Sequence, residues 1–367
     1  MFYAASTYLL SCPLLARHMS DDSRLLALAT AVPAHELHQA EVMERSRLLF
    51  KASPSQIERL LPVYDNAGIE RRFSCVPIQW YLKPHGWAER TELFITNAVS
   101  LLKDAAERCL DQASIDFNEI DTLVTVSTTG IATPSLDARL MEVLPFRRDV
   151  QRLPVFGLGC AGGVTGLARA AALARANPGS KVLMLVVELC GLTFRAQDLS
   201  KSNIIATALF GDGAAALLIS TEGPGLRIEA WGEHTWPQSL DVMGWDVKED
   251  GLGVLFSRDI PALVRDDLRA AVDRFLLRYG LDRLQLAGYV CHPGGAKVLD
   301  ALEEAFEIPR GALRHARETL RYYGNMSAVT VLFVLKRMLA NKLGAGRYLM
   351  SALGPGFTAS FTLLETS

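Results

Sequence analysis

The order of apolar segments along the chain limits the fold more than any other feature of the sequence. Residues 121–128 (DTLVTVST) and 181–187 (KVLMLVV) are β-branched or aliphatic runs with the length of a buried strand. The segment between them, 164–176, is rich in Ala, Leu and Arg and has the composition of a well-packed helix. Strand-like and helix-like segments alternate in this way from Leu25 onward, which predicts an α/β fold.

A second series of elements follows the Gly-Pro-Gly turn at 223–225. We predict strands at 285–291, 348–353 and 358–363 and helices at 261–279, 297–306 and 326–339. The chain therefore divides into an N-terminal half, residues 23–222, and a C-terminal half, residues 223–367. We expect residues 1–22 to be an N-terminal extension outside both halves. Their apolar stretch lacks the preceding basic residues of a secretory signal, and Met19 is an alternative start.

Composition excludes several classes of function. The 38 basic and 40 acidic residues give a net charge of −2, so no positive field is available to hold a nucleic acid backbone. Six cysteines form no C-x-x-C pair, which disfavours zinc sites and a disulfide framework. The apolar runs are shorter than the about 20 residues that cross a bilayer. Small-molecule chemistry, which we expect to take place in the cytoplasm, is the leading class.

The densest motif is the glycine-rich run 155–163 (VFGLGCAGG), which opens the predicted Ala-rich helix. Glycines on both sides of Cys160 allow a sharp bend, and a thiol at a helix N-terminus has the position of a nucleophile. A cysteine is otherwise most often a small core residue. Gly157, Gly159 and Gly162 also spell G-x-G-x-x-G, a dinucleotide-binding fingerprint. That match is weak, because Glu188 follows Gly162 by 26 residues and not by about 20.

Two further residues are candidates for acid–base and hydrogen-bonding roles. His292 follows a strand-like run and precedes Pro-Gly-Gly, so its ring would project from a strand end into a site. Asn325 precedes the predicted helix 326–339 as its N-cap, and capping alone could explain it. The order Cys160, His292, Asn325 also occurs in papain-like proteases, but the Cys-Gly-Ser-Cys-Trp context of those enzymes is missing.

Four motifs make the sequence similar to the type III polyketide synthases of the chalcone synthase superfamily. They are GLGCAGG around Cys160, ALFGDGAAA from Ala208, CHPGG around His292 and YYGNMSA around Asn325. The C-terminal Gly-Pro-Gly core of the family is kept at 354–356. The resemblance implies a thiolase-like αβαβα fold built from two similar halves, and a homodimer. Microbial synthases of alkylresorcinols and alkylpyrones are the most similar in look.

The resemblance also implies a reaction. Cys160 would take the acyl group of a starter acyl-CoA, and malonyl-CoA would lose CO2 while His292 and Asn325 donate hydrogen bonds to the enolate oxygen. His292 as imidazolium would keep Cys160 ionised. Donors of this kind each contribute about 3 to 4 kcal/mol to transition-state stabilisation. No metal or redox cofactor is implied.

The resemblance assigns roles to further residues around the reaction centre. Phe210 and Phe256 match the gatekeepers between the CoA tunnel and the reaction cavity. Residues expected to shape that cavity or its C-terminal loop are Thr128, Thr129, Cys190, Thr193, Val247, Gly354, Pro355 and Gly356. Arg59, Arg71 and Arg72 are the candidates for binding the phosphates of CoA.

The expected starter is a long-chain fatty acyl-CoA, and the expected product is an alkylpyrone or alkylresorcinol. Segments 200–216 and 241–261 resemble the microbial enzymes more than the plant chalcone type. A synthase that uses malonyl-CoA alone or an aromatic starter stays open, as does a chain-initiating ketoacyl-ACP synthase. The latter lacks the Gly-Pro-Gly loop.

Overall fold

The computed structural model describes residues 22–50, 58–257 and 259–367. The predicted extension, residues 1–22, therefore lies outside the described residues except for Asp22. The strands of the N-terminal half are β1 (Ser23–Ala31), β4 (Thr122–Ser127), β5 (Gln151–Phe156), β6 (Val182–Leu189) and β7 (Asp212–Ser220). Those of the C-terminal half are β8 (Leu226–Thr235), β11 (Leu286–Cys291), β12 (Gly346–Gly354) and β13 (Thr358–Thr366).

These strands form one sheet in the order β11-β12-β13-β8-β1-β7-β6-β4-β5. The pairing pattern repeats on both sides of its middle. In the N-terminal half β4 and β6 are parallel, and β6, β7 and β1 are antiparallel neighbours. In the C-terminal half β11 and β12 are parallel, and β12, β13 and β8 are antiparallel neighbours. The two patterns meet where Ser23–Leu25 of β1 pairs with Leu226–Ile228 of β8.

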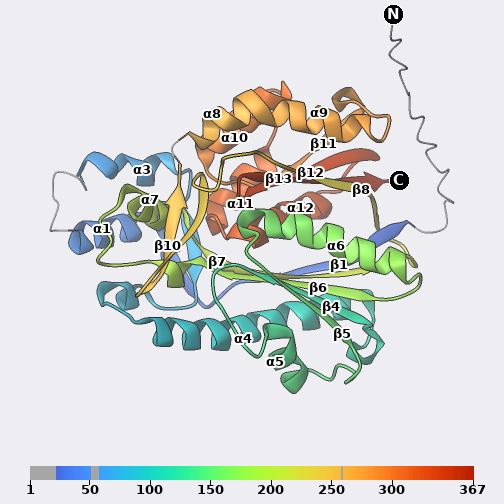
Figure 1. Ribbon diagram of the computed structural model, residues 1–367, viewed down its shortest axis with the longest axis horizontal. Helices are drawn as coiled ribbons and strands as arrows, with labels where there is room; N and C mark the ends of the chain where they lie inside the picture. The colour runs from blue at the N-terminus through green and yellow to red at the C-terminus, as the bar shows by residue number, and fades with distance from the viewer. Residues whose placement is uncertain (1–21, 51–57, 258) are drawn as a thin grey trace, which may run out of the picture.

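The N-terminal strands and the C-terminal strands form two β layers, and with the helices outside and between them they make five layers, as Figure 1 shows. Helices α4 (Trp87–Ala113) and α5 (Leu136–Val143) cover the outer face of the N-terminal strands. Helices α8 (Ile260–Leu263), α9 (Arg269–Leu277) and α10 (Ala296–Phe306) lie on the outer side of the C-terminal strands. Helices α6 (Gly162–Ala176) and α12 (Thr330–Ala340) lie between the two groups and contact strands of both. This is the thiolase-like αβαβα arrangement expected from the sequence.

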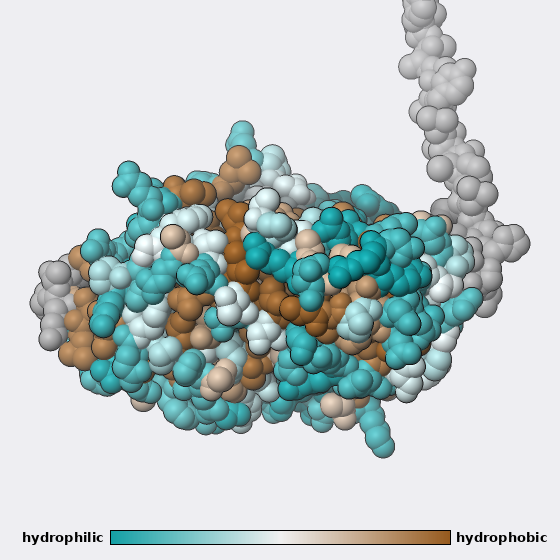
Figure 2. All heavy atoms as spheres, turned by 90° about the horizontal axis from the view of Figure 1, so that it is seen from below, coloured by the Kyte–Doolittle hydropathy of each residue, from teal (hydrophilic) through white to brown (hydrophobic). Residues whose placement is uncertain are grey.

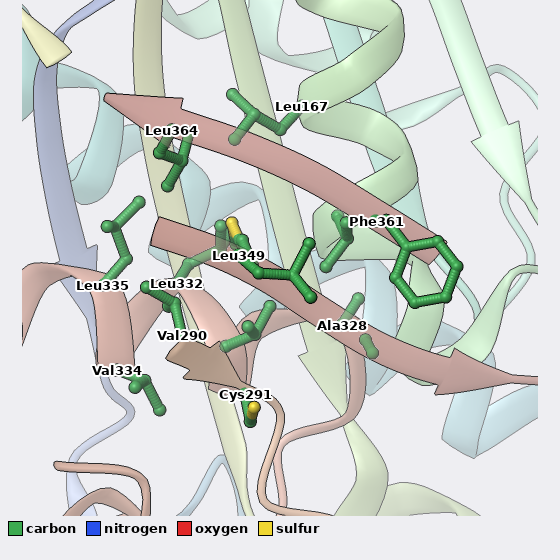
Figure 3. Close-up of a cluster of buried hydrophobic side chains, with 14 of the residues drawn as sticks. Leu167, Val290, Cys291, Ala328, Leu332, Val334, Leu335, Leu349, Phe361 and Leu364 are labelled. Atoms are coloured by element: carbon green, nitrogen blue, oxygen red, sulfur yellow. The ribbon is translucent and has the colours of Figure 1, made fainter. Parts of the chain in front are cut away.

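The middle layer is apolar on nearly all sides because it is covered from above and below. Helix α6 consists largely of Ala, Gly and Leu, which lets the strands of both halves approach its backbone. Figure 3 shows Leu167 of α6 and Leu332, Val334 and Leu335 of α12 together with Phe361 of β13 in this core. Burying such side chains stabilises the fold by about 1.5 to 3 kcal/mol each.

Smaller elements surround one end of the middle layer. They are helices α1 (Gln39–Leu49), α3 (Pro62–Asn66), α7 (Lys201–Leu209) and α11 (Arg314–Tyr323), the strand pair β2 (His35–His38) and β3 (Arg71–Ser74), and the hairpin β9 (Met243–Lys248) and β10 (Gly251–Phe256). No helix of the described residues is long and apolar enough to cross a membrane.

Two predicted helices are interrupted. The segment 326–339 begins as the short 3-10 helix η7 (Ser327–Val329), and α12 starts only at Thr330. The segment 261–279 contains a π-helical turn, η5 (Val264–Leu268), between α8 and α9. The spacing of apolar residues does not reveal such changes of pitch, because the 3-10 and π-helical turns keep the same face of the segment buried.

Candidate active site

The glycine-rich turn holds Cys160 at the start of α6. Gly157 and Gly159 have φ of 91° and 47°, which only glycine adopts without strain. A Cβ on Gly159 would lie 2.6 Å from Cδ of Pro355, so the Gly-Pro-Gly loop at 354–356 packs directly on the turn. The Gly159 N–H donates to Oγ1 of Thr128 at 3.0 Å. Cys160 itself is 8% exposed at the N-terminus of the buried helix.

The next two glycines bring the two halves of the chain into contact. A Cβ on Gly163 would lie 2.2 Å from the carbonyl oxygen of Ala328, and one on Gly162 would lie 3.1 Å from Cβ of Ala328. The first turn of α6 therefore rests on η7, which follows Asn325. The glycines at 159 and 162 serve these close contacts, and the Gly159 N–H is already bound to Thr128 and is not free for a pyrophosphate, which argues against the dinucleotide interpretation.

Asn325 lies beside Cys160 with its amide held in one orientation. Its Oδ1 accepts from the Ser327 N–H at 2.9 Å, and its Nδ2 donates to the Gly294 carbonyl at 3.2 Å. One N–H of the amide is therefore left to donate to a ligand. Asn325 is not the N-cap of a long helix, as the sequence suggested, since η7 separates it from α12.

His292 follows β11 and is 6% exposed. Its backbone N–H donates to the Ser351 carbonyl at 2.9 Å, but both ring nitrogens lack a hydrogen-bond partner within the described chain. A buried polar atom without a partner costs about 1 to 3 kcal/mol, so such an atom is typical of a site whose partner is a ligand.

Cys160, His292 and Asn325 open into one cavity of about 410 Å³. Its wall is otherwise mainly aliphatic: Leu60, Val63, Ile205, Leu209, Met243, Ile260, Leu268, Val298, Leu302 and Leu353 line it together with Phe256. Among the described residues, the charged ones of the lining are Arg59, Lys201 and Lys297, all exposed, and no carboxylate is among them. Lys201 and Lys297 stand in the first turns of α7 and α10, where helix dipoles also favour anions.

A second, smaller cavity of about 70 Å³ lies beyond Phe210 and is lined by Cys190 and Thr193. The Phe210 ring lies 5.6 Å from the ring of Phe256 and 6.4 Å from that of Trp245, measured between centroids. Phe210 lines the small cavity and Phe256 the large one. The two predicted gatekeepers therefore meet at the boundary between the cavities.

Thr128 and Thr129 surround a buried carboxylate instead of facing the large cavity. Oε2 of Glu188, at the end of β6, accepts from the backbone N–H groups of Thr128 and Thr129, both at 3.0 Å, and from Oγ1 of Thr129 at 2.8 Å. Burial nevertheless raises the pKa of Glu188 to about 7, with these hydrogen bonds opposing the shift. The Ser327 hydroxyl also opposes the rise in the pKa of Glu188, and it opposes that of Cys160 in the same way.

The free site favours uncharged forms of its two central groups. Burial raises the pKa of Cys160 to about 12, against the hydrogen bonds from Ser327 and Asn325. Burial also lowers the pKa of His292 to about 3. The expected imidazolium–thiolate pair is therefore opposed by desolvation, and the free site favours a thiol and a neutral imidazole.

Three further sequence-based assignments do not hold. Arg72 is 3% exposed and its guanidinium is bound to backbone carbonyls, so it is not available to CoA. Arg71 pairs with Glu36 at 3.1 Å and does not line the cavity. Val247 is 71% exposed on β9 and does not shape the cavity of the described chain. Only Arg59 of the three arginines reaches the cavity.

Sequence reasoning missed Lys201 and Lys297. Both were visible as cations next to recognised motifs, since Lys201 begins the helix that leads to Phe210 and Lys297 follows CHPGGA. Ser327, within YYGNMSA, was also missed. Among the described residues no cluster of three or more His, Cys, Asp or Glu side chains could hold a metal ion.

The five layers and the convergence of two half-sites on a cysteine define a thiolase-like α/β enzyme. The comparisons with known proteins identify its family. Residues 15–223 match the sequence model "Chalcone and stilbene synthases, N-terminal domain", and residues 227–366 match the corresponding C-terminal domain. The chain belongs to this family, the type III polyketide synthases, which are decarboxylating, Claisen-condensing acyltransferases.

Several characterised or named proteins are similar over nearly the whole chain. A Bacillus subtilis (strain 168) protein with chalcone synthase as its provisional name is 39% identical, covering 93% of this chain and 98% of its own. A 1,3,6,8-tetrahydroxynaphthalene synthase of Streptomyces peucetius subsp. caesius is 36% identical over 92% of both chains. The crystal structure of the Streptomyces coelicolor A3(2) tetrahydroxynaphthalene synthase, a bacterial type III polyketide synthase, superposes with a TM-score of 0.89. It has 31% identity and covers 94% of this chain and 100% of its own.

Proposed function

We propose that this type III polyketide synthase loads a long-chain fatty acyl-CoA on Cys160, extends it with malonyl-CoA and releases an alkylpyrone or alkylresorcinol. One observation supports the proposal above all others. Cys160, His292 and Asn325 converge on a single aliphatic cavity whose charged lining residues, within the described parts of the chain, are Arg59, Lys201 and Lys297, with no acid among them. Such a cavity suits a fatty chain joined to a thioester, with the phosphates of CoA at the cationic end.

Loading would begin with proton transfer from the Cys160 thiol to the neutral imidazole of His292. The sulfur attacks the thioester carbonyl of the starter, the tetrahedral oxyanion accepts hydrogen bonds from His292 and Asn325, and CoA leaves as a thiol with the proton returned by His292. The products are an acyl-Cys160 thioester and free CoA. Desolvation opposes this charge separation, so the transfer would have to be coupled to attack, when the negative charge passes from the sulfur to the oxyanion that His292 and Asn325 bind.

Extension would use the same two donors on a second substrate. Malonyl-CoA loses its carboxylate as CO2, and the two electrons of the broken C–C bond form an enolate whose oxygen accepts from His292 and Asn325. The enolate carbon attacks the acyl-Cys160 carbonyl and expels the cysteine sulfur, which leaves a chain longer by two carbons on CoA. Side chains supply every group in these steps, so the proposal includes no metal or redox cofactor.

A second candidate is a synthase that uses malonyl-CoA as both starter and extender. Relatives that are 36% and 32% identical are named 1,3,6,8-tetrahydroxynaphthalene synthase, which favours this alternative. The aliphatic lining of the large cavity favours a fatty starter instead. The two candidates share the loading and extension chemistry and differ only in the starter.

The deciding experiment offers malonyl-CoA alone and with acyl-CoA starters from C2 to C18, and reads the product masses. We expect products that carry the fatty chain, and no products from Cys160→Ala. Cys109→Ala is the matched control, because Cys109 is buried in α4 and does not line the cavity. Products from malonyl-CoA alone, with no fatty chain incorporated, would favour the second candidate. Polyketide formation by Cys160→Ala would contradict the mechanism.

We also propose that the enzyme is a homodimer. Strand β5 is the outermost strand of the sheet, with one unpaired edge, and Leu153 and Phe156 on it are 37% and 56% exposed. Figure 2 shows a band of apolar side chains on the side that carries α4 and α5. An open edge of this kind is normally covered. Light scattering should give twice the 40.1 kDa chain mass for the unaltered protein and the chain mass for Phe156→Asp.

A further inference from the structure

The backbone that carries Phe210 is held from behind by a buried arginine. Helix α7 ends at Leu209, and the last carbonyls of a helix have no partner within it. Nη1 of Arg72, on β3, donates to the Thr207 carbonyl at 2.7 Å and to the Phe210 carbonyl at 3.1 Å. Its Nη2 donates to the Ala208 carbonyl at 3.1 Å. One guanidinium therefore binds three carbonyls of the turn that ends in Phe210.

A glutamine completes this attachment. Nη2 of Arg72 also donates to Oε1 of Gln39, and Nε2 of Gln39 donates to the Ala208 and Tyr64 carbonyls at 3.1 and 3.0 Å. Arg72 and Gln39 are both buried. Desolvation lowers the pKa of Arg72 to about 10, and the negative field of the buried Asp212 works against that shift. The side chain is therefore still charged at neutral pH.

The same turn is joined to Asn325 on its other side. Phe210 and Asn325 form an isolated parallel β-bridge, in which the Asn325 N–H donates to the Leu209 carbonyl at 2.8 Å and the Gly211 N–H to the Asn325 carbonyl at 3.0 Å. The stem of Arg72 packs on this bridge, since a Cβ on Gly211 would lie 3.2 Å, and one on Gly324 3.4 Å, from its Cβ. The arginine thus contacts both backbone segments of the bridge.

We propose that Arg72 is a positioning residue that holds the gate side chain Phe210 and the amide of Asn325 in a single arrangement, and so sets how many extensions occur before release. The expected effect on the number of extensions rests on the proposed function. The positioning of Phe210 and Asn325 by Arg72 rests only on the hydrogen bonds described above. No other residue donates from one rigid group to three carbonyls at the end of α7 among the described hydrogen bonds.

The first test is independent of activity. Lysine at position 72 keeps the charge, but its single ammonium has neither the reach nor the planar fork to bind Thr207, Ala208 and Phe210 together. In Arg72→Lys we expect faster hydrogen exchange of the Gly211 and Asn325 amides, measured by mass spectrometry. Arg71→Lys is the control, because Arg71 is the next residue of β3 and pairs with Glu36 at the surface. Equal exchange in both variants would overturn the inference.

The second test uses product ratios and a double-mutant cycle. In Arg72→Lys we expect a lower kcat, on the order of tenfold because small misplacements of reacting groups are costly, and a shifted ratio of short to long products. Because the shift acts through the ring of Phe210, it should vanish when Arg72→Lys is introduced into Phe210→Ala. An unchanged ratio, or the same shift in the Phe210→Ala background, would contradict the inference.

If Arg72→Lys does not fold, Gln39→Ala takes its place in both tests. This substitution keeps the arginine and removes one of its hydrogen-bond acceptors. The same faster exchange and the same direction of product shift are expected, and their absence would overturn the inference. An unaltered protein that forms no polyketide from malonyl-CoA with any starter would contradict the proposed function. The exchange measurement would still decide the role of Arg72.

Discussion

Gly163 is the position at which one added carbon should separate the two halves of the active site. A Cβ there would lie 2.2 Å from the Ala328 carbonyl oxygen and 2.9 Å from Cγ1 of Val331. The oxygen belongs to the backbone of η7 and cannot rotate away, so α6 and η7 must move apart by about 1 Å to reach ordinary contact. Overpacking of this kind costs about 1 to 3 kcal/mol of unfolding free energy.

The effect of Gly163→Ala on catalysis should exceed its effect on stability. Cys160 lies on the α6 side of this contact, and Asn325 and Ser327 lie on the η7 side. A displacement of about 1 Å between reacting groups costs on the order of a hundredfold in rate. We expect kcat for condensation to fall on the order of a hundredfold. The unfolding free energy, measured by urea denaturation, should fall by about 1 to 3 kcal/mol.

The matched control for Gly163→Ala is Gly244→Ala. Gly244 lies in β9, where an added Cβ meets nothing within 4 Å. This variant should keep both stability and kcat. If Gly163→Ala kept its kcat within about twofold of the unaltered enzyme, the argument that this contact sets the distance between Cys160 and Asn325 would be refuted.

Two further predictions concern charged groups. Burial raises the pKa of Glu188 from 4.5 to about 7, so the folded state binds a proton that the unfolded chain has lost, and stability falls as pH rises from about 4.5 to 7. Between pH 5 and 8 the unfolding free energy, measured by urea titration, should fall by about 2 to 3 kcal/mol less in Glu188→Gln than in the unaltered protein. The same pH dependence in both proteins would contradict the raised pKa of Glu188. Lys297→Ala should raise KM for acyl-CoA about two- to fivefold with kcat retained, while Lys103→Ala on α4 should change neither. An equal effect on an N-acetylcysteamine thioester, which lacks the phosphates, would show that Lys297 does not act on CoA.

The sequence was sufficient for the parts of the site that depend on local order. Cys160 in its glycine turn, His292 after a strand and Asn325 in its motif were all recognisable, because each is fixed by the residues next to it. Their meeting in one cavity was expected from the resemblance, and the structure shows it. The alternation of apolar segments likewise predicted the α/β fold, since buried strands and helices differ in composition and length.

The errors arose where the environment of a side chain depends on distant segments. Arg72 looks like any surface cation in the sequence, but α7 and Gln39 enclose it from more than 30 residues away. Val247 was placed in the cavity by its motif, and the direction in which a hairpin strand faces is not encoded in that motif. The desolvation that opposes ionisation of Cys160 and His292 was likewise not visible in the sequence, because it comes from the whole fold.

The short β1–β8 junction makes this enzyme suited to recombination of its halves. In the described part of the sheet, the two pairing patterns are joined by three residues of β1, Ser23–Leu25, and three of β8, Leu226–Ile228, and the adjoining turn at 223–225 is exposed. A chimera cut at this turn would keep its own nucleophile and acquire the His, the Asn and one cavity wall from the donor. Its compatibility would depend on the shared layer of α6 and α12, and within it on residues 163 and 328, where a glycine and an alanine face each other in the parental halves.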